Sequence, residues 1–186
     1  MMVGVLALQG AFREHIEALN TLGAEAKEIR KLSDLANLDG IILPGGESTV
    51  QGKLLRELDM LNPLRDMILS GLPVLATCAG LILLSKTIEN DKNRYLATLP
   101  VTVKRNAYGR QLGSFITNGK VGDFNNFEMV FIRAPYITEV DNSVDVLSKY
   151  DDKITGVRYK NQIALSFHPE LSKDTRLHEL FLSITK

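Results

Sequence analysis

The only cysteine of the chain, Cys78, stands in the segment Thr77-Cys78-Ala79-Gly80, between two short apolar runs. A sharp strand-to-helix turn exposes a side chain above a sheet, as the nucleophile turn of hydrolases does for serine. The start of a helix favours a thiolate, and the backbone N–H of Ala79 would point to the place where an oxyanion forms. A lone cysteine by itself favours a buried structural residue, and the strand-turn-helix setting makes a nucleophile an equally good interpretation before any partner is considered.

A thiol nucleophile needs a base, and His168 is the best candidate. It follows the apolar run Gln162–Phe167 and precedes Glu170 by two positions. A carboxylate at this spacing can hold the imidazole in one tautomer and leave its other nitrogen for the thiol. The segment His168-Pro169-Glu170 alone also suits an ordinary turn, so the prediction depends on its combination with Cys78.

The other two histidines are His15 and His178. We place both away from the apolar stripes of amphipathic helices. The sequence therefore predicts that both are solvated surface residues with no part in the chemistry.

A glycine-rich turn, Pro44–Ser48, follows another apolar run. Its two glycines let the backbone turn tightly and bring N–H groups close to a ligand, where they can supply a second oxyanion donor. Ser48 as the cap of the next helix is the alternative interpretation. A phosphate-binding P-loop is excluded, because five residues separate Gly46 from Gly52 and Leu54 follows Lys53.

Apolar runs alternate with amphipathic stretches in the first half of the chain. The predicted strands are Val3–Leu8, Glu25–Ile29, Gly40–Leu43 and Pro73–Thr77, and the predicted helices are Ala11–Leu22, one from Glu47 or Ser48, Pro63–Ser70 and Leu81–Ser85. Such alternation predicts a parallel sheet with helices on both faces and ligands beyond the carboxyl ends of the strands. The segments that follow three of these strands, Gln9-Gly10, Gly45–Ser48 and Cys78–Gly80, should therefore meet at one edge.

The second half has shorter strand-like runs with turn residues between them. They are Leu99–Lys104, Glu128–Arg133, Val144–Ser148, Ile154–Tyr159 and Gln162–Phe167. Lys160-Asn161 suits a hairpin turn. A terminal helix is predicted over Thr175–Ile184 with Asp174 as a possible cap, and Asn62 is the corresponding candidate cap before Pro63.

Length and composition limit the class of protein. The 186 residues suit a single domain over residues 1–186, and Lys+Arg and Asp+Glu both total 22, which argues against a nucleic-acid partner. One cysteine allows no intrachain disulfide and fits a reducing compartment. The apolar N-terminal stretch is too short to span a bilayer and lacks signal-peptide features, so we expect a cytoplasmic protein without a membrane partner.

The motifs together resemble a known family. Gly45–Ser48, Thr77–Gly80 and His168–Glu170 look like the oxyanion loop and catalytic triad of class I glutamine amidotransferases. Three further stretches narrow the resemblance to the glutaminase subunits of pyridoxal 5'-phosphate synthase: Leu8–His15, Arg105–Gln111 and Phe131–Pro135.

The resemblance implies a three-layer α/β/α sandwich of flavodoxin-like character, with a mixed, mostly parallel sheet. Cys78 would be the nucleophile, His168 the general base and acid, and Glu170 its orienting partner. The implied glutamine contacts are Gly46, Glu47, Ser48, Arg105, Ile132 and Arg133, and the implied oxyanion donors are Gly46 and Ala79.

The same resemblance implies a reaction and a partner. L-glutamine would be hydrolysed to L-glutamate and ammonia through a thioester, with no metal and no cofactor. The ammonia would pass through an internal channel to a synthase subunit with a (β/α)₈ barrel, whose docking orders the oxyanion loop. One departure is Ala76, which stands where the family's nucleophile turn usually begins with glycine, and its methyl group could shift the turn slightly.

Other functions remain compatible with the residues alone. Another cysteine hydrolase on the same fold would share the three side chains, and a non-catalytic binding module would keep the scaffold. A flavodoxin-like nucleotide or flavin binder lacks support because no phosphate motif is present. Arg105 and Arg133, without the resemblance, also suit surface or structural ion pairs.

Overall fold

A computed structural model describes residues 1–106 and 113–185. The helices are α1 (Phe12–Thr21), α2 (Ser48–Glu57), α3 (Leu61–Leu69), α4 (Ala79–Leu84) and α5 (Arg176–Ile184), with short 3₁₀ turns η1 (Leu32–Leu35) and η2 (Pro169–Leu171). The strands are β1 (Met2–Leu6), β2 (Glu25–Ile29), β3 (Gly40–Leu43), β4 (Val74–Thr77), β5 (Ser85–Ile88), β6 (Leu99–Lys104), β7 (Ser114–Val121), β8 (Phe124–Ile132), β9 (Tyr136–Val140), β10 (Asp145–Tyr150), β11 (Lys153–Tyr159) and β12 (Gln162–Leu165). Within these described ranges, no helix is long and apolar enough to cross a membrane.

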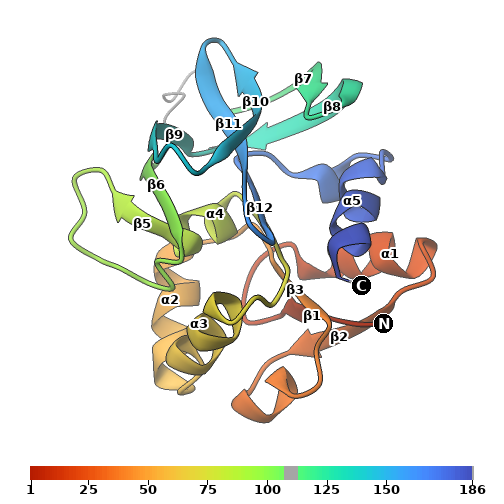
Figure 1. The fold of residues 1–186 in the computed structure, drawn as a ribbon, viewed down its shortest axis with the longest axis vertical. Coiled ribbons are helices and arrows are strands. Elements are labelled where there is room, and N and C mark those ends of the chain that lie inside the picture. Colours follow the sequence, from red (N-terminus) through yellow and green to blue (C-terminus); the bar gives the residue numbers. More distant parts are fainter. Residues whose placement is uncertain (107–112, 186) are drawn as a thin grey trace.

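A ten-stranded mixed sheet forms the centre of the molecule. Its order is β2-β1-β3-β4-β12-β11-β9-β6-β5, with β10 paired to β11. The first five strands in this order, β2, β1, β3, β4 and β12, run parallel, and β11 is antiparallel to β12. Figure 1 shows α1 and α5 on one face of the parallel part, and α2 and α3 on the other. The predicted α/β sandwich with a mostly parallel sheet is confirmed.

Alternation along the buried strands explains the two helical layers. In β3, Ile41 and Leu43 pack into the core beneath α2, α3 and α4, whereas Ile42 faces the core that contains residues of α1 and α5. Successive strand side chains point to opposite faces, so a strand that is apolar at every position must be covered on both. The run Gly40–Leu43, buried throughout, therefore demands the three-layer arrangement.

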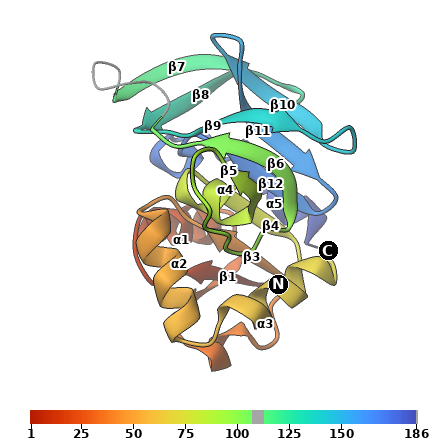
Figure 2. The same ribbon diagram turned by 90° about the vertical axis from the view of Figure 1, so that its left-hand side faces the viewer.

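The antiparallel ribbon of β7 and β8 lies outside the main sheet (Figure 2). Its aromatic residues attach it to the rest of the chain: Phe131 lies 5.6 Å, centroid to centroid, from Phe167 just after β12. The backbone N–H of His168 also donates to the carbonyl of Val130 at 2.9 Å. The ribbon is thus fixed beside the carboxyl end of β12.

The strand ends meet as predicted, and glycine permits the approach. A Cβ atom on Gly10 would lie 1.8 Å from the carbonyl oxygen of Gly45, and one on Gly80 would lie 2.1 Å from that of Leu43. The N–H of Ala11 donates to the Gly45 carbonyl at 3.0 Å. The turns after β1, β3 and β4 therefore touch through their backbones.

Most predicted elements are present, with shifted ends, and several corrections follow. Helix α3 begins at Leu61. Asn62, predicted to cap this helix, and Pro63, predicted to be its first residue, therefore both lie inside it. Thr175, not Asp174, precedes α5, although Asp174 Oδ1 still accepts the N–H of Arg176 at 3.2 Å. The hairpin at Lys160 is confirmed by the antiparallel register of β11 and β12.

Strands β5, β7 and β9 were not predicted. In the family segment Arg105–Gln111, residues 107–111 lie outside the described residues. Ala76 lies in β4 opposite Leu43 and Ala164 and is fully buried, so the sheet accommodates its methyl group.

Replacing Gly80 by alanine should destabilise the chain. The new methyl group would meet the backbone of Leu43, which cannot rotate away as a side chain can. Overpacking typically costs about 1–3 kcal/mol, which exceeds the roughly 1 kcal/mol that alanine gains over glycine in a helix. Urea unfolding should therefore show a lower midpoint than in the wild type.

The matched control is Gly119→Ala in β7, where the added Cβ would meet only the flexible end of Met129. This variant should unfold close to the wild type. Equal midpoints for Gly80→Ala and wild type would show that the turn after β4 tolerates a side chain.

Candidate active site

Cys78 occupies a strained turn between β4 and α4. Its φ of 48° and ψ of −99° lie in a region that residues other than glycine rarely adopt. The surrounding structure holds it there: the Cys78 N–H donates to the carbonyl of Leu165 at 2.8 Å, and Gly80 packs against Leu43. Such strain persists where neighbouring contacts determine the backbone, and it is frequent at functional sites.

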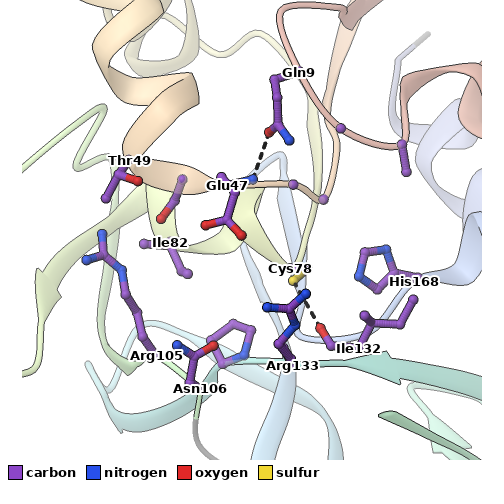
Figure 3. A pocket seen from close by; sticks show the side chains of 16 residues that line it. Gln9, Glu47, Thr49, Cys78, Ile82, Arg105, Asn106, Ile132, Arg133 and His168 are labelled. Atoms are coloured by element: carbon purple, nitrogen blue, oxygen red, sulfur yellow. Dashed lines mark hydrogen bonds between the residues drawn. The ribbon is translucent and has the colours of Figure 1, made fainter. Parts of the chain in front are cut away.

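Cys78 is 7% exposed and lines a cavity. Its Sγ atom lies 3.9 Å from the carbonyl oxygen of Ile132 at the end of β8, the contact drawn as a dashed line in Figure 3. His168 lines the same cavity and lies beside the thiol in that view. Cys78 and His168 therefore come together, as the sequence predicted.

Glu170 lies behind His168, in η2. Its Oε1 is 2.7 Å from His168 Nδ1, and both side chains are buried. Because the carboxylate accepts from Nδ1, the Nε2 atom of the ring remains for the thiol. The predicted spacing of two residues thus produces the expected histidine–carboxylate pair.

The electrostatics of the pair favour charged forms at neutral pH. Burial by itself would lower the pKa of His168, but hydrogen bonds and charges from Cys78 and Glu170 outweigh it and raise the pKa to about 10. Burial would likewise raise the pKa of Glu170, yet contacts with His15 and His168 hold it below its ordinary value. The site therefore contains an imidazolium beside a carboxylate.

The prediction that His15 and His178 lie on the surface is wrong. They are 0% and 1% exposed, and His15 Nδ1 lies 2.9 Å from His178 Nε2. His15 Nε2 lies 3.4 Å from Oε2 of Glu170. Burial lowers the pKa of both histidines, that of His178 to about 3, so both are neutral at pH 7.

A cavity of about 470 Å³ opens above the thiol. It is lined by Gln9, Gly10, Ala11, Gly45, Gly46, Glu47, Ser48, Thr49, Cys78, Ile82, Arg105, Asn106, Ile132, Arg133, Pro135 and His168. All six predicted glutamine contacts are among these residues, whereas Ala79, buried at the start of α4, is not. The structure thus brings the six predicted residues to one cavity, while Gln9, Thr49 and Asn106 were given no role.

The glycine-rich turn is held from outside by two glutamines. The N–H of Glu47 donates to Oε1 of Gln9 at 2.7 Å, and Nε2 of Gln51 donates to the Gln9 carbonyl at 2.9 Å. Ser48 is the first residue of α2, after Glu47, so the alternative that Ser48 caps this helix is wrong. Gln9 sits in the segment after β1 that was expected to reach this edge, which is the signal that could have identified it.

Besides His168, three charged side chains line the cavity, namely Glu47, Arg105 and Arg133 (Figure 3). Arg105 also makes an ion pair with Asp91, with Nη1 and Oδ2 2.5 Å apart, so the structural alternative for this residue is present beside its place in the lining. The cavity thus combines a carboxylate and two guanidinium groups around one thiol.

Comparisons with known proteins show which proteins this chain resembles in structure and in sequence. A crystal structure described as a glutamine amidotransferase superposes with a TM-score of 0.94 at 46% identity, covering 98% of each chain. A pyridoxal 5'-phosphate synthase subunit PdxT from Desulfitobacterium hafniense is 62% identical over 98% of this chain and 92% of its own length. The PdxT subunit of Streptococcus pneumoniae is 50% identical over 100% and 98%.

The fold and the cavity define a glutamine amidotransferase. More particularly, the model of the SNO glutamine amidotransferase family matches residues 5–186, and the chain belongs to that family.

The raised pKa of His168 has a consequence for stability. The folded chain binds the His168 proton more tightly than the unfolded chain, whose value is 6.5. The stabilisation is therefore fully present below pH 6.5 and is lost as the pH rises through about 10. The difference in unfolding free energy between wild type and His168→Gln should shrink over this range.

Urea unfolding of both proteins at several pH values from 6 to about 10 measures the difference. Taking the difference between the two proteins removes the contribution of every group whose titration the substitution leaves unchanged. A difference that stays constant across the range would mean that His168 is not protonated in the folded chain.

Proposed function

We propose that this chain hydrolyses L-glutamine to L-glutamate and ammonia with Cys78, His168 and Glu170 as its catalytic residues. The observation that carries the proposal is the thiol on the strained turn, beside an imidazole whose far nitrogen is held by a buried carboxylate. That arrangement supplies a nucleophile, a proton carrier and its orienting group within one cavity.

In the first half of the reaction, the Cys78 thiolate attacks the side-chain carbonyl carbon of glutamine. The carbonyl π electrons move to oxygen, and the backbone N–H groups of Gly46 and Ala79 are the proposed donors to that oxyanion. Such donors stabilise charge only as it develops, which lowers the barrier rather than the ground state. The C–N bond then breaks as His168 gives its proton to the leaving nitrogen, and ammonia departs.

In the second half, the acyl group remains on Cys78 as a thioester. Neutral His168 takes a proton from water, the resulting hydroxide attacks the thioester carbon, and glutamate leaves with release of the thiolate. Glu170 keeps Nδ1 of the ring protonated in both halves, so that Nε2 handles every transferred proton. Covalent catalysis in this way divides one difficult step into two.

The charges of the cavity suit the amino-acid end of the substrate. The Glu47 carboxylate is matched to the α-ammonium group, and Arg133 and Arg105 to the α-carboxylate. Gly46, Ser48 and Ile132 complete the proposed glutamine contacts.

The ammonia goes to pyridoxal 5'-phosphate synthesis. Support comes from the relatives named as PdxT subunits of pyridoxal 5'-phosphate synthase, which align with nearly the whole chain. The proposed partner is a (β/α)₈-barrel synthase subunit that covers the cavity and receives the ammonia through its interior, because free ammonia is lost to solvent from an open site.

The decisive test is glutamate release from glutamine, with and without the synthase subunit. We expect activity to appear or rise sharply with the subunit and to vanish in Cys78→Ala, because no other thiol exists in the chain. Activity that ignores the synthase would remove the partner from the proposal. Substantial turnover by folded Cys78→Ala would remove the mechanism.

A second prediction concerns glutamine recognition. Arg133→Gln should raise KM for glutamine by about tenfold or more with a smaller effect on kcat, because it removes a charge-assisted hydrogen bond far from the scissile bond. Steady-state kinetics of the complex measures both constants. Arg65→Gln on α3, exposed and outside the cavity lining, is the matched control and should leave both unchanged.

A further inference from the structure

The mechanism above uses one oxygen of Glu170 and leaves the other unexplained. Oε1 pairs with His168, whereas Oε2 is fully buried and has His15 Nε2 at 3.4 Å. That distance exceeds the roughly 2.7–3.2 Å of a well-formed N–H···O bond, so the contact is a long, charge-directed one. A buried carboxylate oxygen without a donor costs free energy, which makes this neighbour important.

The chain of contacts fixes which nitrogens carry protons. His15 Nδ1 and His178 Nε2 lie 2.9 Å apart, so one donates and the other accepts. If His15 donated from Nδ1, its Nε2 lone pair would face the Glu170 carboxylate, and the two would repel. The tautomer with a proton on His15 Nε2, and therefore on His178 Nε2, turns the same contact into an attraction.

His15 also reaches the nucleophile turn. Its Nε2 lies 3.3 Å from Oγ1 of Thr77, the residue before Cys78, and that oxygen accepts the N–H of Gly45 at 3.0 Å. One imidazole thus contacts the carboxylate behind His168 and the residue that joins the β4 turn to the glycine-rich turn.

We propose that His15 is a positioning residue of this site: in its neutral form it donates from Nε2 toward Glu170 and Thr77, while His178 fixes its tautomer. The inference rests on the proposed glutaminase function and extends it. His15 holds Glu170 so that its other oxygen stays aligned with His168, and it ties that alignment to the turns bearing the nucleophile and the oxyanion donors.

Burial supports this assignment. Desolvation lowers the pKa of both His15 and His178, so both rings are neutral at pH 7 and each has one N–H and one lone pair, as in the proposed arrangement. The other ionisable groups acting on His15 are Glu170, His168 and, along its own helix, Glu14. Loss of the His15 N–H should raise the pKa of Glu170, because the carboxylate loses a partner that favours its charged form.

The tautomers can be read directly in the wild-type chain. Long-range ¹H–¹⁵N correlation spectra of the imidazole rings at neutral pH should show His15 and His178 each protonated on Nε2 alone, with His168 protonated on both nitrogens. A proton on Nδ1 of His15 would overturn the proposal without any variant and without any enzyme assay.

The functional test compares His15→Phe, which fills the ring's space without an N–H, with His15→Gln, whose amide N–H can reach the Nε2 position. In the complex with the synthase subunit, His15→Phe should lower kcat on the order of tenfold to a hundredfold, the factor corresponding to one hydrogen bond to a charged group. KM should stay nearly unchanged. The acid limb of the kcat/KM profile should move to higher pH, because Glu170 is then protonated more readily.

His15→Gln should recover most of kcat and the wild-type acid limb. Equal losses in the two variants, or a folded His15→Phe with wild-type kcat and pH profile, would overturn the positioning role. If circular dichroism shows His15→Phe to be unfolded, the imidazole spectra of the wild type and the kinetics of His15→Gln test the positioning role instead. A wild-type complex that releases no glutamate would instead refute the proposed function, and the ring spectra would still test the His15–Glu170 contact.

Discussion

Direct backbone contact between neighbouring strand-end turns is the constraint on which the rest of the site depends. The turn after β1 touches the turn after β3 through Gly10 and Gly45, and α4 touches the end of β3 through Gly80 and Leu43. A single added carbon at Gly10 or Gly80 would lie within about 2 Å of a carbonyl oxygen, far inside van der Waals contact. The thiol of Cys78 is placed by these contacts rather than by its own rotamer alone.

Close packing at this edge excludes water, so a buried charge here needs partners within the protein. Glu170 is almost fully buried, where an unpaired carboxylate would be protonated. Two imidazoles flank it, one positively charged at His168 and one neutral at His15. Each oxygen has its own neighbour, and removing either neighbour would leave a buried charge partly unsatisfied, which is more costly than never burying it.

Sequence reasoning identified what local patterns determine and missed what depends on packing between distant segments. The apolar runs and the turns after them predicted the parallel strands and the position of Cys78. The two buried histidines were misplaced because polarity was given more weight than spacing: His15 is three residues after Phe12 and four before Leu19, on the buried face of α1. Strand β7 was missed because its alternating exposed positions carry a weak apolar signal, and its partner β8 decides its pairing.

The distribution of charge follows from the same packing. The turns that meet at the strand ends are largely glycine where they touch, so they have little room for the long side chains that recognise a zwitterion. Recognition groups must therefore enter from the rim: Glu47 projects from the start of α2, and Arg133 follows the end of the β7–β8 ribbon. The ribbon is fixed to the segment after β12 that bears His168 by the bond from the His168 N–H to the Val130 carbonyl, so Arg133 and the proposed base share one support. A displacement of the ribbon would therefore move two of the proposed substrate contacts, Ile132 and Arg133, together with the Ile132 carbonyl beside the thiol.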